Sequence, residues 1–424
     1  MKVLLSAYAC EPGRGSEPGA GWGWAQQTAR FHEVWVVTWG EQQAAIERTL
    51  SVHPLPNAHF VYLDLRRWRK IRRLGRLGGH IFYYVWQIAA YFVGRKLHRR
   101  ESFDLVHHVT FGASWFPTFL PFLPVPFIWG PIGAGSPCPR IFHREFSFRG
   151  KVDEWARQAL LVVSRLDPIR RQTEKRASVI LAVSSVTVEQ LRPKNRRKAL
   201  LLSQVGVDWK EIARLPQKRS NDGSHFRLLS VGSLLHWKGF ALGIKAFALF
   251  NQQYPNSEYC IIGDGPERTK LTELVSSMGL SGAVQLPGSL SRRDYLHQLV
   301  RSDLLLHPSL HEPGAYVIAE AMAAQLPVVC LDFGEPASIV TPETGIKVPL
   351  SSPEGVVAGI FQACARLAAN PSLCDRMGDA GRKRILDLFE WGKKGQFLAR
   401  IYEEVKKPRS PRSSEHWNLD FDSF

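Results

Sequence analysis

Residues 227–267 read RLLSVGSLLHWKGFALGIKAFALFNQQYPNSEYCIIGDGPE and decide the fold. The apolar run 227–231 ends in Gly-Ser, and the segment 241–252 that follows has helical length and apolar periodicity. A second apolar run, 258–262, ends in Gly-Asp-Gly-Pro-Glu. Short strands that alternate with helical segments indicate βαβ units, so this stretch predicts a parallel sheet.

The same alternation continues on both sides of this stretch. Towards the C-terminus we expect helices at 267–278, 292–301 and 315–324 and strands at 283–286, 304–307 and 327–331. Towards the N-terminus we expect strands at 3–7, 34–38, 60–63, 105–109, 127–129, 179–183 and 199–202, with helices such as 21–30 and 79–98 between them. The 424 residues exceed what one hydrophobic core usually organises. We therefore predict an α/β protein with two doubly wound, parallel-sheet domains.

A polar stretch with proline, glycine and charged residues, 214–224, interrupts the alternation and is typical of a linker. We therefore expect an N-terminal domain at 1–213 and a C-terminal domain at 225–390. One more helical segment, 391–407, follows the second domain. The Ser-, Pro- and charge-rich end, 408–424, predicts a disordered tail.

The formal net charge is +17, and the arginines and lysines gather in two segments, 66–76 and 95–100. Such density attracts polyanions, for which the candidates are an anionic membrane surface, phosphorylated lipid and nucleic acid. The apolar run 81–94 between them has 14 residues, well short of the roughly 20 that cross a bilayer, so we expect no transmembrane segment. The alternative is that 81–94 is an ordinary core helix and the basic residues form a solvated surface.

Six cysteines occur, and none forms a C-x-x-C pair. Cys260 and Cys330 lie inside apolar runs, which is typical of reduced core cysteines in a cytoplasmic protein. The apolar start of the chain, Met1–Cys10, favours a first β-strand over a secretion signal.

Glycines and a helix start mark a candidate anion site in the C-terminal half. They follow predicted strands, at the sheet edge where open α/β sheets bind ligands. Glycine lets the backbone approach a diphosphate closely, and the first N–H groups of a helix can hold a negative oxygen. The candidate residues are Gly232, Ser233, Gly263, Gly265, Gly314, Ala315 and Tyr316.

Three charged residues accompany these loops. Lys238 follows the first glycine turn and adds a positive charge. Glu312 and Glu320 are separated by seven residues, and Glu320 falls in the second turn of a predicted helix. A carboxylate there suits the vicinal hydroxyls of a ribose, because its two oxygens accept two hydrogen bonds.

In order and spacing, these segments resemble the retaining nucleotide-sugar glycosyltransferases of family four, also called group 1. The motifs that carry the resemblance are VGSLLHWKGF, IIGDGPER, HPSLHEPGAYVIAEAMAAQLPVVC, TPETGIKVPL and FEWGKKGQFLARIYEEV. The resemblance implies the GT-B fold, in which two Rossmann-like domains face a central cleft. It also implies that the helix at 391–407 crosses back to the N-terminal domain.

The resemblance also implies roles for individual residues. Lys238 would neutralise the diphosphate leaving group, Glu312 would contact sugar hydroxyls, and Glu320 would contact the ribose. His107 or His108, in DLVHH, would position the donor sugar, although neighbouring strand residues point to opposite faces and one of the pair can belong to the core. Gly19 and Gly21, in SEPGAGW, occupy the place of a glycine-rich loop that faces the donor phosphates.

The sequence departs from the family pattern at several positions. Ser233 replaces the usual arginine, and Gly314-Ala315 replaces the usual Phe-Gly. Gly334-Glu335 stands where a glycine pair is common, and Ser338 where a glutamate is common. No D-x-D motif occurs in the candidate donor loops, so we expect transfer without a metal or other cofactor.

The function that we predict is retaining transfer of a sugar from a nucleotide-sugar donor to a glycan or lipid-linked acceptor in surface polysaccharide synthesis. The partners would be the donor, the acceptor and an anionic membrane surface, with the enzyme cytoplasmic and peripheral on the inner face of the membrane. Alternatives are a GT-B sugar-nucleotide epimerase and a small-molecule glycosyltransferase. A nucleic-acid-binding protein is suggested by the charge alone, and the sequence shows no recognised binding module for it.

Overall fold

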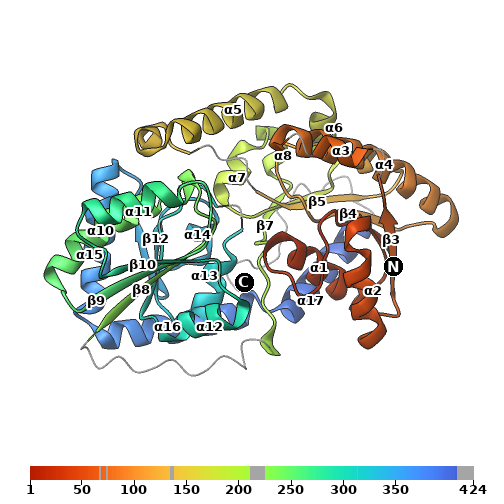
Figure 1. Ribbon diagram of the computed structural model, residues 1–424. Helices are drawn as coiled ribbons and strands as arrows, with labels where there is room; N and C mark the ends of the chain where they lie inside the picture. The colour runs from red at the N-terminus through yellow and green to blue at the C-terminus, as the bar shows by residue number, and fades with distance from the viewer. Residues whose placement is uncertain (66–67, 73–74, 134–137, 211–224, 313, 408–424) are drawn as a thin grey trace. The chain divides into compact units, whose positions relative to one another are not determined.

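The computed structural model describes residues 1–65, 68–72, 75–133, 138–210, 225–312 and 314–407 (Figure 1). The chain divides into two compact units. Unit 1 comprises residues 1–135, 160–206 and 391–424, and unit 2 comprises residues 136–159 and 207–390. The expected linker at 214–224 and the expected tail at 408–424 lie outside the described residues.

Unit 1 is built on a seven-stranded sheet in the order β3-β2-β1-β4-β5-β6-β7. All neighbouring strands are parallel, and the central strand β1 pairs with both β2 and β4. The strands are β1 (Lys2–Ser6), β2 (Glu33–Trp39), β3 (Ala58–Leu63), β4 (Leu105–His108), β5 (Phe127–Ile132), β6 (Val179–Ala182) and β7 (Ala199–Leu201). The chain therefore leaves β1 towards one edge and returns to build the other, as in a doubly wound Rossmann-like domain.

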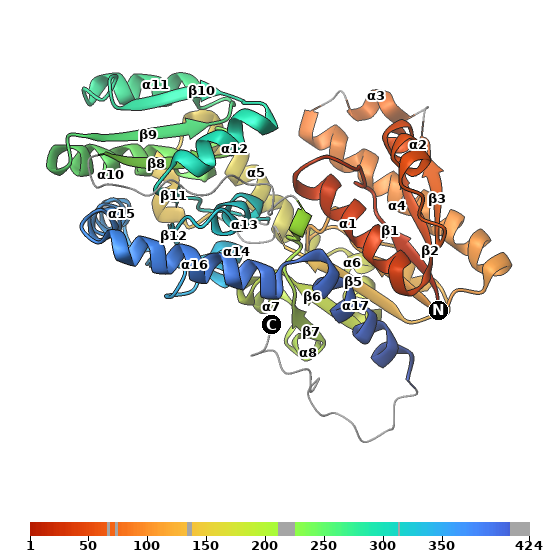
Figure 2. The same ribbon diagram turned by 90° about the horizontal axis from the view of Figure 1, so that it is seen from below.

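The helices of unit 1 connect these parallel strands. They are α1 (Ser16–Phe31), α2 (Gln43–Val52), α3 (Arg69–Arg72), α4 (Gly75–Glu101), α6 (Pro168–Arg176), α7 (Ser185–Gln190), α8 (Pro193–Arg196) and α17 (Trp391–Lys406), with the 3-10 turns η1 (Gly40–Gln42) and η3 (Leu120–Phe122). The last helix, α17, packs against α1 (Figure 2). The Trp391 ring fills the space next to Gly23 and Gly206, where a Cβ would lie within 2.3 Å of it.

The apolar run 81–94 lies within α4, and several of its large residues belong to the core of unit 1, whereas Ile81 and Phe92 are exposed. Phe82, Tyr83, Trp86 and Ala90 are all buried, and the last three belong to one apolar cluster together with residues of β1, β2, β4 and β5. In the part of the chain that the structure describes, no helix is long and apolar enough to cross a membrane. Packing against the core therefore explains the apolar residues on the buried side of α4.

Unit 2 is built on a six-stranded parallel sheet in the order β10-β9-β8-β11-β12-β13. Its strands are β8 (Phe226–Val231), β9 (Ser257–Ile262), β10 (Val284–Gly288), β11 (Leu304–His307), β12 (Val328–Leu331) and β13 (Gly345–Val348). Its helices are α10 (Phe240–Gln253), α11 (Arg268–Ser277), α12 (Arg292–Arg301), α13 (Tyr316–Ala323), α14 (Gly334–Ile339), α15 (Pro353–Ala368) and α16 (Pro371–Leu388), with the 3-10 turn η5 (His236–Lys238). Its central strand, β8, pairs with β9 and β11.

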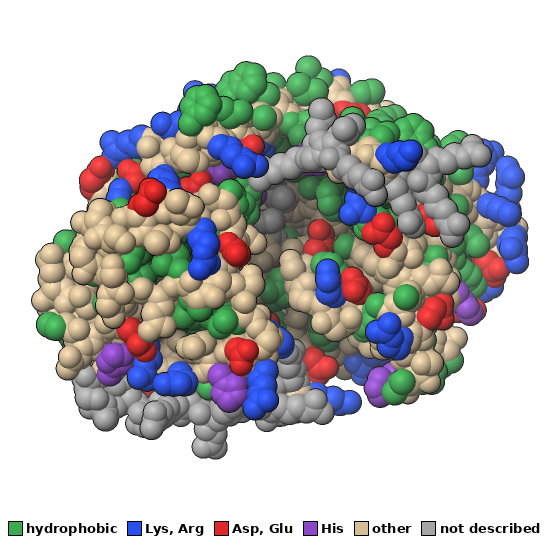
Figure 3. Space-filling model, viewed as in Figure 1, with side chains coloured by type: hydrophobic (Ala, Val, Ile, Leu, Met, Phe, Trp, Pro, Cys, Tyr) green, Lys and Arg blue, Asp and Glu red, His purple; other side chains and the backbone are tan. Residues whose placement is uncertain are grey.

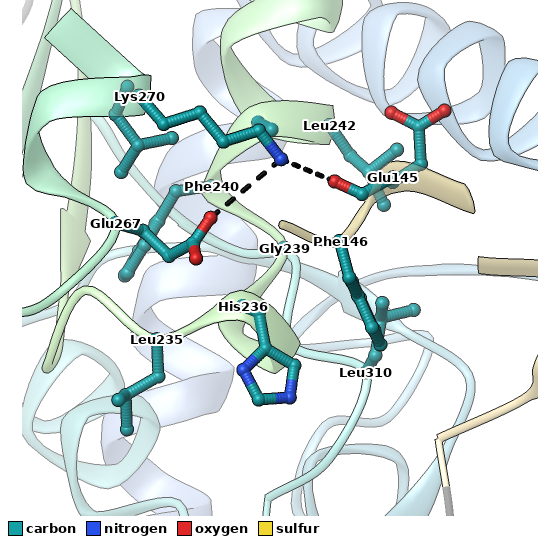
Figure 4. A pocket seen from close by; sticks show the side chains of 12 residues that line it. Glu145, Phe146, Leu235, His236, Gly239, Phe240, Leu242, Glu267, Lys270 and Leu310 are labelled. Carbon is teal, nitrogen blue, oxygen red and sulfur yellow. Dashed lines mark hydrogen bonds and ion pairs between the residues drawn. The ribbon is translucent and has the colours of Figure 1, made fainter. Parts of the chain in front are cut away.

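The unit boundaries differ from the expected ones in two places. Unit 2 resumes at residue 207, inside the expected N-terminal domain, and it also includes 136–159, which precedes strands of unit 1 in sequence. This segment contains the 3-10 turn η4 (Arg140–Glu145) and the start of α5 (Phe148–Ser164). Figure 4 shows the pocket that η4 closes: Phe146 lies against His236, with ring centroids 4.8 Å apart, and Lys270 Nζ donates to the Glu145 carbonyl at 2.5 Å. None of the site residues predicted from the sequence lines this pocket.

Candidate functional site

The three predicted motifs of unit 2 meet at one edge of its sheet. The loops that follow β8, β9 and β11 leave from neighbouring parallel strands, because β8 is paired with both of the others. Backbone hydrogen bonds tie the loops together: Leu234 N donates to Asp264 O at 2.9 Å, and Leu310 N donates to Trp237 O at 2.8 Å. Residues distant in sequence are therefore held together at the carboxyl ends of the strands, where α/β sheets bind ligands.

Glycines make this close approach of the loops possible. Gly239 ends η5 with φ +68, and a Cβ at this position would lie 2.0 Å from the Pro308 carbonyl oxygen. A Cβ on Gly263, whose φ is +139, would lie 2.0 Å from the Gly232 carbonyl oxygen, and a Cβ on Gly265 would lie 2.6 Å from that of Leu234. The glycines predicted for phosphate binding thus also fit the loops against each other. Ser233, between them, is exposed.

Lys238 and Glu312 form an ion pair at this edge, and their side chains are only 16% and 9% exposed. His307, at the end of β11, places Nε2 3.3 Å from the same carboxylate oxygen, Oε2, that Lys238 contacts. Burial alone would raise the pKa of Glu312, but the charge of Lys238 and the contact with His307 outweigh burial and lower this pKa to about 2. Glu312 is therefore an anion at neutral pH, held in place by a cation.

His307 was not singled out in the sequence. Burial lowers the pKa of its imidazole more than the neighbouring Glu312 carboxylate raises it, so the ring is neutral at neutral pH. A neutral ring near Glu312 restrains the carboxylate without cancelling its charge. The signal in the sequence was the position of His307 directly after an apolar strand, in the motif His-Pro-Ser.

Glu320 lies in α13 and is held from α12. Its Oε1 accepts a hydrogen bond from Arg292 Nη1 at 2.6 Å, and its Oε2 accepts one from the Tyr295 hydroxyl at 2.6 Å. The carboxylate thus has a fixed orientation, with its side chain 24% exposed. Each carboxylate oxygen can accept a second hydrogen bond, so these partners leave room for hydroxyl donors. No local pattern in the sequence pairs Glu320 with residues 25 and 28 positions earlier.

The start of α13 departs from the prediction at Ala315. Its N–H donates to Glu335 Oε2 at 3.2 Å, and the Glu335 side chain is fully buried. Three backbone N–H groups were predicted to bind an oxygen of the nucleotide-sugar donor. One of them, the N–H of Ala315, thus already donates to a carboxylate of the chain itself. Gly314 and Tyr316 are partly exposed beside it, and Tyr316 begins the helix. Glu335 is the residue that replaces a glycine in the family pattern, so this departure lies within the candidate site.

His107 is a core residue of unit 1. It is completely buried, with Nε2 2.7 Å from the Gly130 carbonyl and Nδ1 2.6 Å from the Tyr402 hydroxyl of α17. A carbonyl only accepts, so Nε2 carries the proton and Nδ1 accepts from Tyr402. Burial lowers the pKa of His107 to about 3, so the ring is neutral. Both nitrogens have partners within the protein, which leaves His107 no ring nitrogen for a sugar.

His108 points to the other face of β4 and is 3% exposed. Its Nε2 lies 3.3 Å from the Tyr83 hydroxyl and its Nδ1 3.2 Å from Ser6 Oγ. Burial lowers the pKa of this ring as well, to about 3. Contact of His108 with the donor sugar stays a prediction that rests on its place at the end of β4.

Gly19 and Gly21 lie inside α1, and the glycine-rich segment predicted as a loop is helical from Ser16 onward. A Cβ on Gly19 would lie 2.1 Å from the Arg14 carbonyl oxygen, and one on Gly21 would lie 1.9 Å from that of Ala9. The two glycines therefore let the preceding loop pack on the first turns of the helix. Their contact with donor phosphates stays a prediction.

Comparison with known proteins identifies part of the chain. Residues 211–384 match the family model of the glycosyl transferases group 1. Over these residues the chain is similar to the group 1 glycosyltransferases. The matched segment contains Lys238, Glu312 and Glu320, and it covers most of unit 2.

Curated relatives of this chain are glycosyltransferases and a glycogen synthase. The alpha-D-kanosaminyltransferase of Streptomyces kanamyceticus is 29% identical over 254 residues, 56% of this chain and 64% of that protein. The glycogen synthase of Mycobacterium tuberculosis is 27% identical over 206 residues, 48% of each chain. The lipopolysaccharide core biosynthesis glycosyltransferase LpsE of Rhizobium meliloti is 30% identical over 163 residues, 38% of this chain and 45% of that protein. The matches thus span between about half and two thirds of these relatives.

Solved structures show that the fold is GT-B. The sucrose-phosphate synthase of Thermosynechococcus elongatus superposes with a TM-score of 0.64 at 17% identity, covering 95% of this chain and 98% of that chain. WaaG, a glycosyltransferase involved in lipopolysaccharide biosynthesis, superposes with a TM-score of 0.57 at 18% identity, covering 94% and 99%. The predicted fold class of two Rossmann-like, parallel-sheet domains is therefore confirmed.

Proposed function

We propose that this protein is a retaining glycosyltransferase that moves a sugar from a nucleotide-sugar donor to a glycan or lipid-linked acceptor of a surface polysaccharide. The observation that carries the proposal is the largely buried Lys238–Glu312 pair with His307, inside the segment that matches the group 1 glycosyltransferases. Relatives such as LpsE, whose name places it in lipopolysaccharide core synthesis, support the class of acceptor.

Lys238 is the residue that we assign to the leaving group. When the bond between the sugar and the diphosphate breaks, negative charge grows on the diphosphate, and a fixed cation stabilises that state more than the ground state. In the structure Lys238 is already held by Glu312. Its Nζ lies 3.7 Å from the point where a Cβ of Gly232 would stand, so it borders the glycine turn. Little reorganisation is then needed during the reaction.

Glu312 and Glu320 are assigned to the two sugars of the donor. Glu312, an anion at neutral pH, accepts hydrogen bonds from hydroxyls of the transferred sugar. Glu320, oriented by Arg292 and Tyr295, accepts them from the ribose. In a retaining transfer the acceptor hydroxyl attacks from the face that the diphosphate leaves, so the departing diphosphate can take up the proton of the acceptor.

A panel of nucleotide-sugars read by thermal unfolding tests this proposal. A donor that binds the folded state only raises the melting temperature, by an amount that grows with concentration over Kd. Transfer from the stabilising donor to a sugar or lipid-linked sugar then distinguishes this function from the alternatives. Epimerisation of the donor without an acceptor supports a sugar-nucleotide epimerase, and transfer to small-molecule acceptors alone supports a small-molecule glycosyltransferase.

Glu320→Ala is expected to raise the KM for the donor by roughly tenfold and to change kcat by less than about threefold. Contacts to the ribose are made equally in the ground state and the transition state, so losing them weakens binding without slowing the bound complex. Steady-state kinetics with varied donor measure the split. Tyr295→Phe, which removes one partner of Glu320, should shift KM in the same direction by less. A fall in kcat with unchanged KM would contradict the ribose role.

Activity is expected to persist in EDTA. In this proposal Lys238 and backbone N–H groups bind the diphosphate without a metal ion. No D-x-D motif occurs in the donor loops. Among the described residues, no group of three or more His, Cys, Asp or Glu side chains is placed to hold a metal ion. Initial rates with and without EDTA provide the measurement. Loss of activity that Mg²⁺ or Mn²⁺ restores would overturn metal-independent transfer.

A further inference from the structure

Helix α5 presents an apolar stripe to solvent. The residues at helical spacing on its outer face are exposed, and the stripe continues two residues beyond the helix. Figure 3 shows apolar side chains gathered at the top of the view, where α5 lies in Figure 1. The exposed fractions along the stripe are Phe148 85%, Val152 49%, Trp155 73%, Val162 61%, Val163 61% and Leu166 66%. Ala156 and Ala159, on the same face, are also exposed. Contiguous apolar surface of this kind marks an interaction site.

The inner face of α5 carries the polar residues. Glu154 is 1% exposed, pairs with Arg157 at 3.0 Å and accepts a hydrogen bond from the Cys138 N–H at 3.1 Å. Arg157 in turn lies against the His311 ring, with 3.1 Å between Nη1 and Nε2. A surface helix of a soluble protein normally turns its apolar stripe inward and its charges outward. The orientation of α5 is the reverse, so its apolar face is left for a partner.

We propose that this face of α5 docks on the surface of an anionic phospholipid bilayer, with the helix lying in the plane of the interface. At 3.6 residues per turn, Arg149 and Lys151 fall on either side of the apolar stripe. Both are exposed, and the exposed Arg165 lies at the far end. An apolar stripe bordered by basic side chains is the arrangement of interfacial helices, because the cations meet headgroup phosphates while the apolar residues enter the acyl boundary.

Charge favours a bilayer over a second copy of the chain. Two copies of the chain, each with a formal charge of +17, would bring the basic side chains beside the two stripes close together, and these would repel each other. Anionic lipid attracts the same side chains. In the basic segment 66–76, residues 66–67 and 73–74 lie outside the described residues, and Arg72 has partners within the chain. Arg72 there pairs with Glu41 at 3.3 Å and lies over the Trp39 ring at 4.0 Å. The proposal supplies a contact surface for the membrane partner that the sequence analysis predicts, and its test needs no transfer assay.

Flotation with vesicles tests the proposal on the full chain. Val162→Glu/Val163→Glu should lower partitioning onto phosphatidylglycerol-containing vesicles by roughly tenfold or more, because the acyl boundary rejects charge. Val52→Glu, on an isolated exposed valine at the end of α2, and Phe92→Glu, on the exposed side of α4, are the matched controls and should bind within about twofold of wild type. High salt and pure phosphatidylcholine vesicles should both weaken wild-type binding. Equal flotation of the double variant and wild type overturns the proposal.

A fluorescent label distinguishes the bilayer from other occupants. All six native cysteines are buried or half-buried, so Ala159→Cys can be labelled selectively with an environment-sensitive dye, with Glu273→Cys on α11 as the exposed control. The label at 159 should shift to the blue only when anionic vesicles are added. A label already shielded without vesicles shows that the chain itself or a second copy covers the stripe, and overturns the proposal. A dimer in sedimentation that the double variant abolishes does the same.

Discussion

Lys238→Ala is expected to lower turnover by about a hundredfold or more while the protein still folds. Removing one preorganised group that stabilises developing charge costs on the order of 3 kcal/mol in the transition state. Glu312 fixes Lys238 in a largely buried place, so the cation is already oriented when the diphosphate leaves. Single-turnover kinetics at saturating donor measure the effect, with circular dichroism to verify folding. Near-normal turnover by a folded variant would refute the leaving-group role.

The same substitution is expected to lower stability, and a second variant separates this effect from catalysis. Lys238→Ala leaves Glu312 buried without its cation, and uncompensated buried charge is costly. Lys238→Ala/Glu312→Gln removes that charge, so it should recover much of the melting temperature without recovering activity. Recovery of activity in the double variant would mean that Lys238 only balances Glu312.

The stability from this ion pair also has a predicted pH dependence. The pKa of Glu312 in the folded protein, about 2, lies below the ordinary carboxyl value. The unfolded chain therefore binds the proton first as the pH falls, so the pair stabilises the fold above the ordinary carboxyl range. This contribution is lost between that range and pH 2, where wild type and Lys238→Ala should converge in stability.

Glu312→Gln is expected to reduce kcat by roughly a hundredfold with a change in donor KM below about fivefold. The amide can still accept a hydrogen bond but has no charge, and hydrogen bonds to charged groups are worth about 1.5–3 kcal/mol. Because Glu312 also positions Lys238, its loss affects the group that meets the leaving diphosphate. The measurement is steady-state kinetics with varied donor.

Glu273→Gln on α11, an exposed carboxylate outside the site, is the matched control and should retain wild-type kinetics. If Glu312→Gln raises KM strongly while kcat is kept, and Glu320→Ala does the opposite, the two glutamates have been assigned to the wrong sugars. If both variants behave like the control, the site lies elsewhere.

The sequence by itself determined the class of fold and indicated a candidate site. Alternating strands and helices are a local property of hydrophobic periodicity, so the two parallel sheets could be predicted from residue patterns alone. The order and spacing of the glycine turns, Lys238, Glu312 and Glu320 resemble those of group 1 glycosyltransferases, and parallel strands bring the carboxyl ends that carry these residues to one edge of the sheet.

Only the tertiary structure decided which partners these residues have. Arg292 and Tyr295 hold Glu320, and Glu335 accepts from the Ala315 amide, although each lies 20 or more positions from its partner. His107 also has distant partners, because its two ring nitrogens form hydrogen bonds with the Gly130 carbonyl and the Tyr402 hydroxyl. Such contacts depend on how strands and helices pack, and no local pattern encodes them.

For the exposed face of helix α5 as well, the sequence determines one part and only the tertiary structure decides the other. Residues 148–166 have apolar residues at helical spacing, which predicts an apolar helix face. The spacing does not determine whether that face points to the core or to solvent. The buried Glu154–Arg157 pair, satisfied by the backbone of Cys138 and the ring of His311, turns the apolar stripe outward. The direction of that face follows from contacts with residues up to 154 positions away, which exist only once the chain has folded.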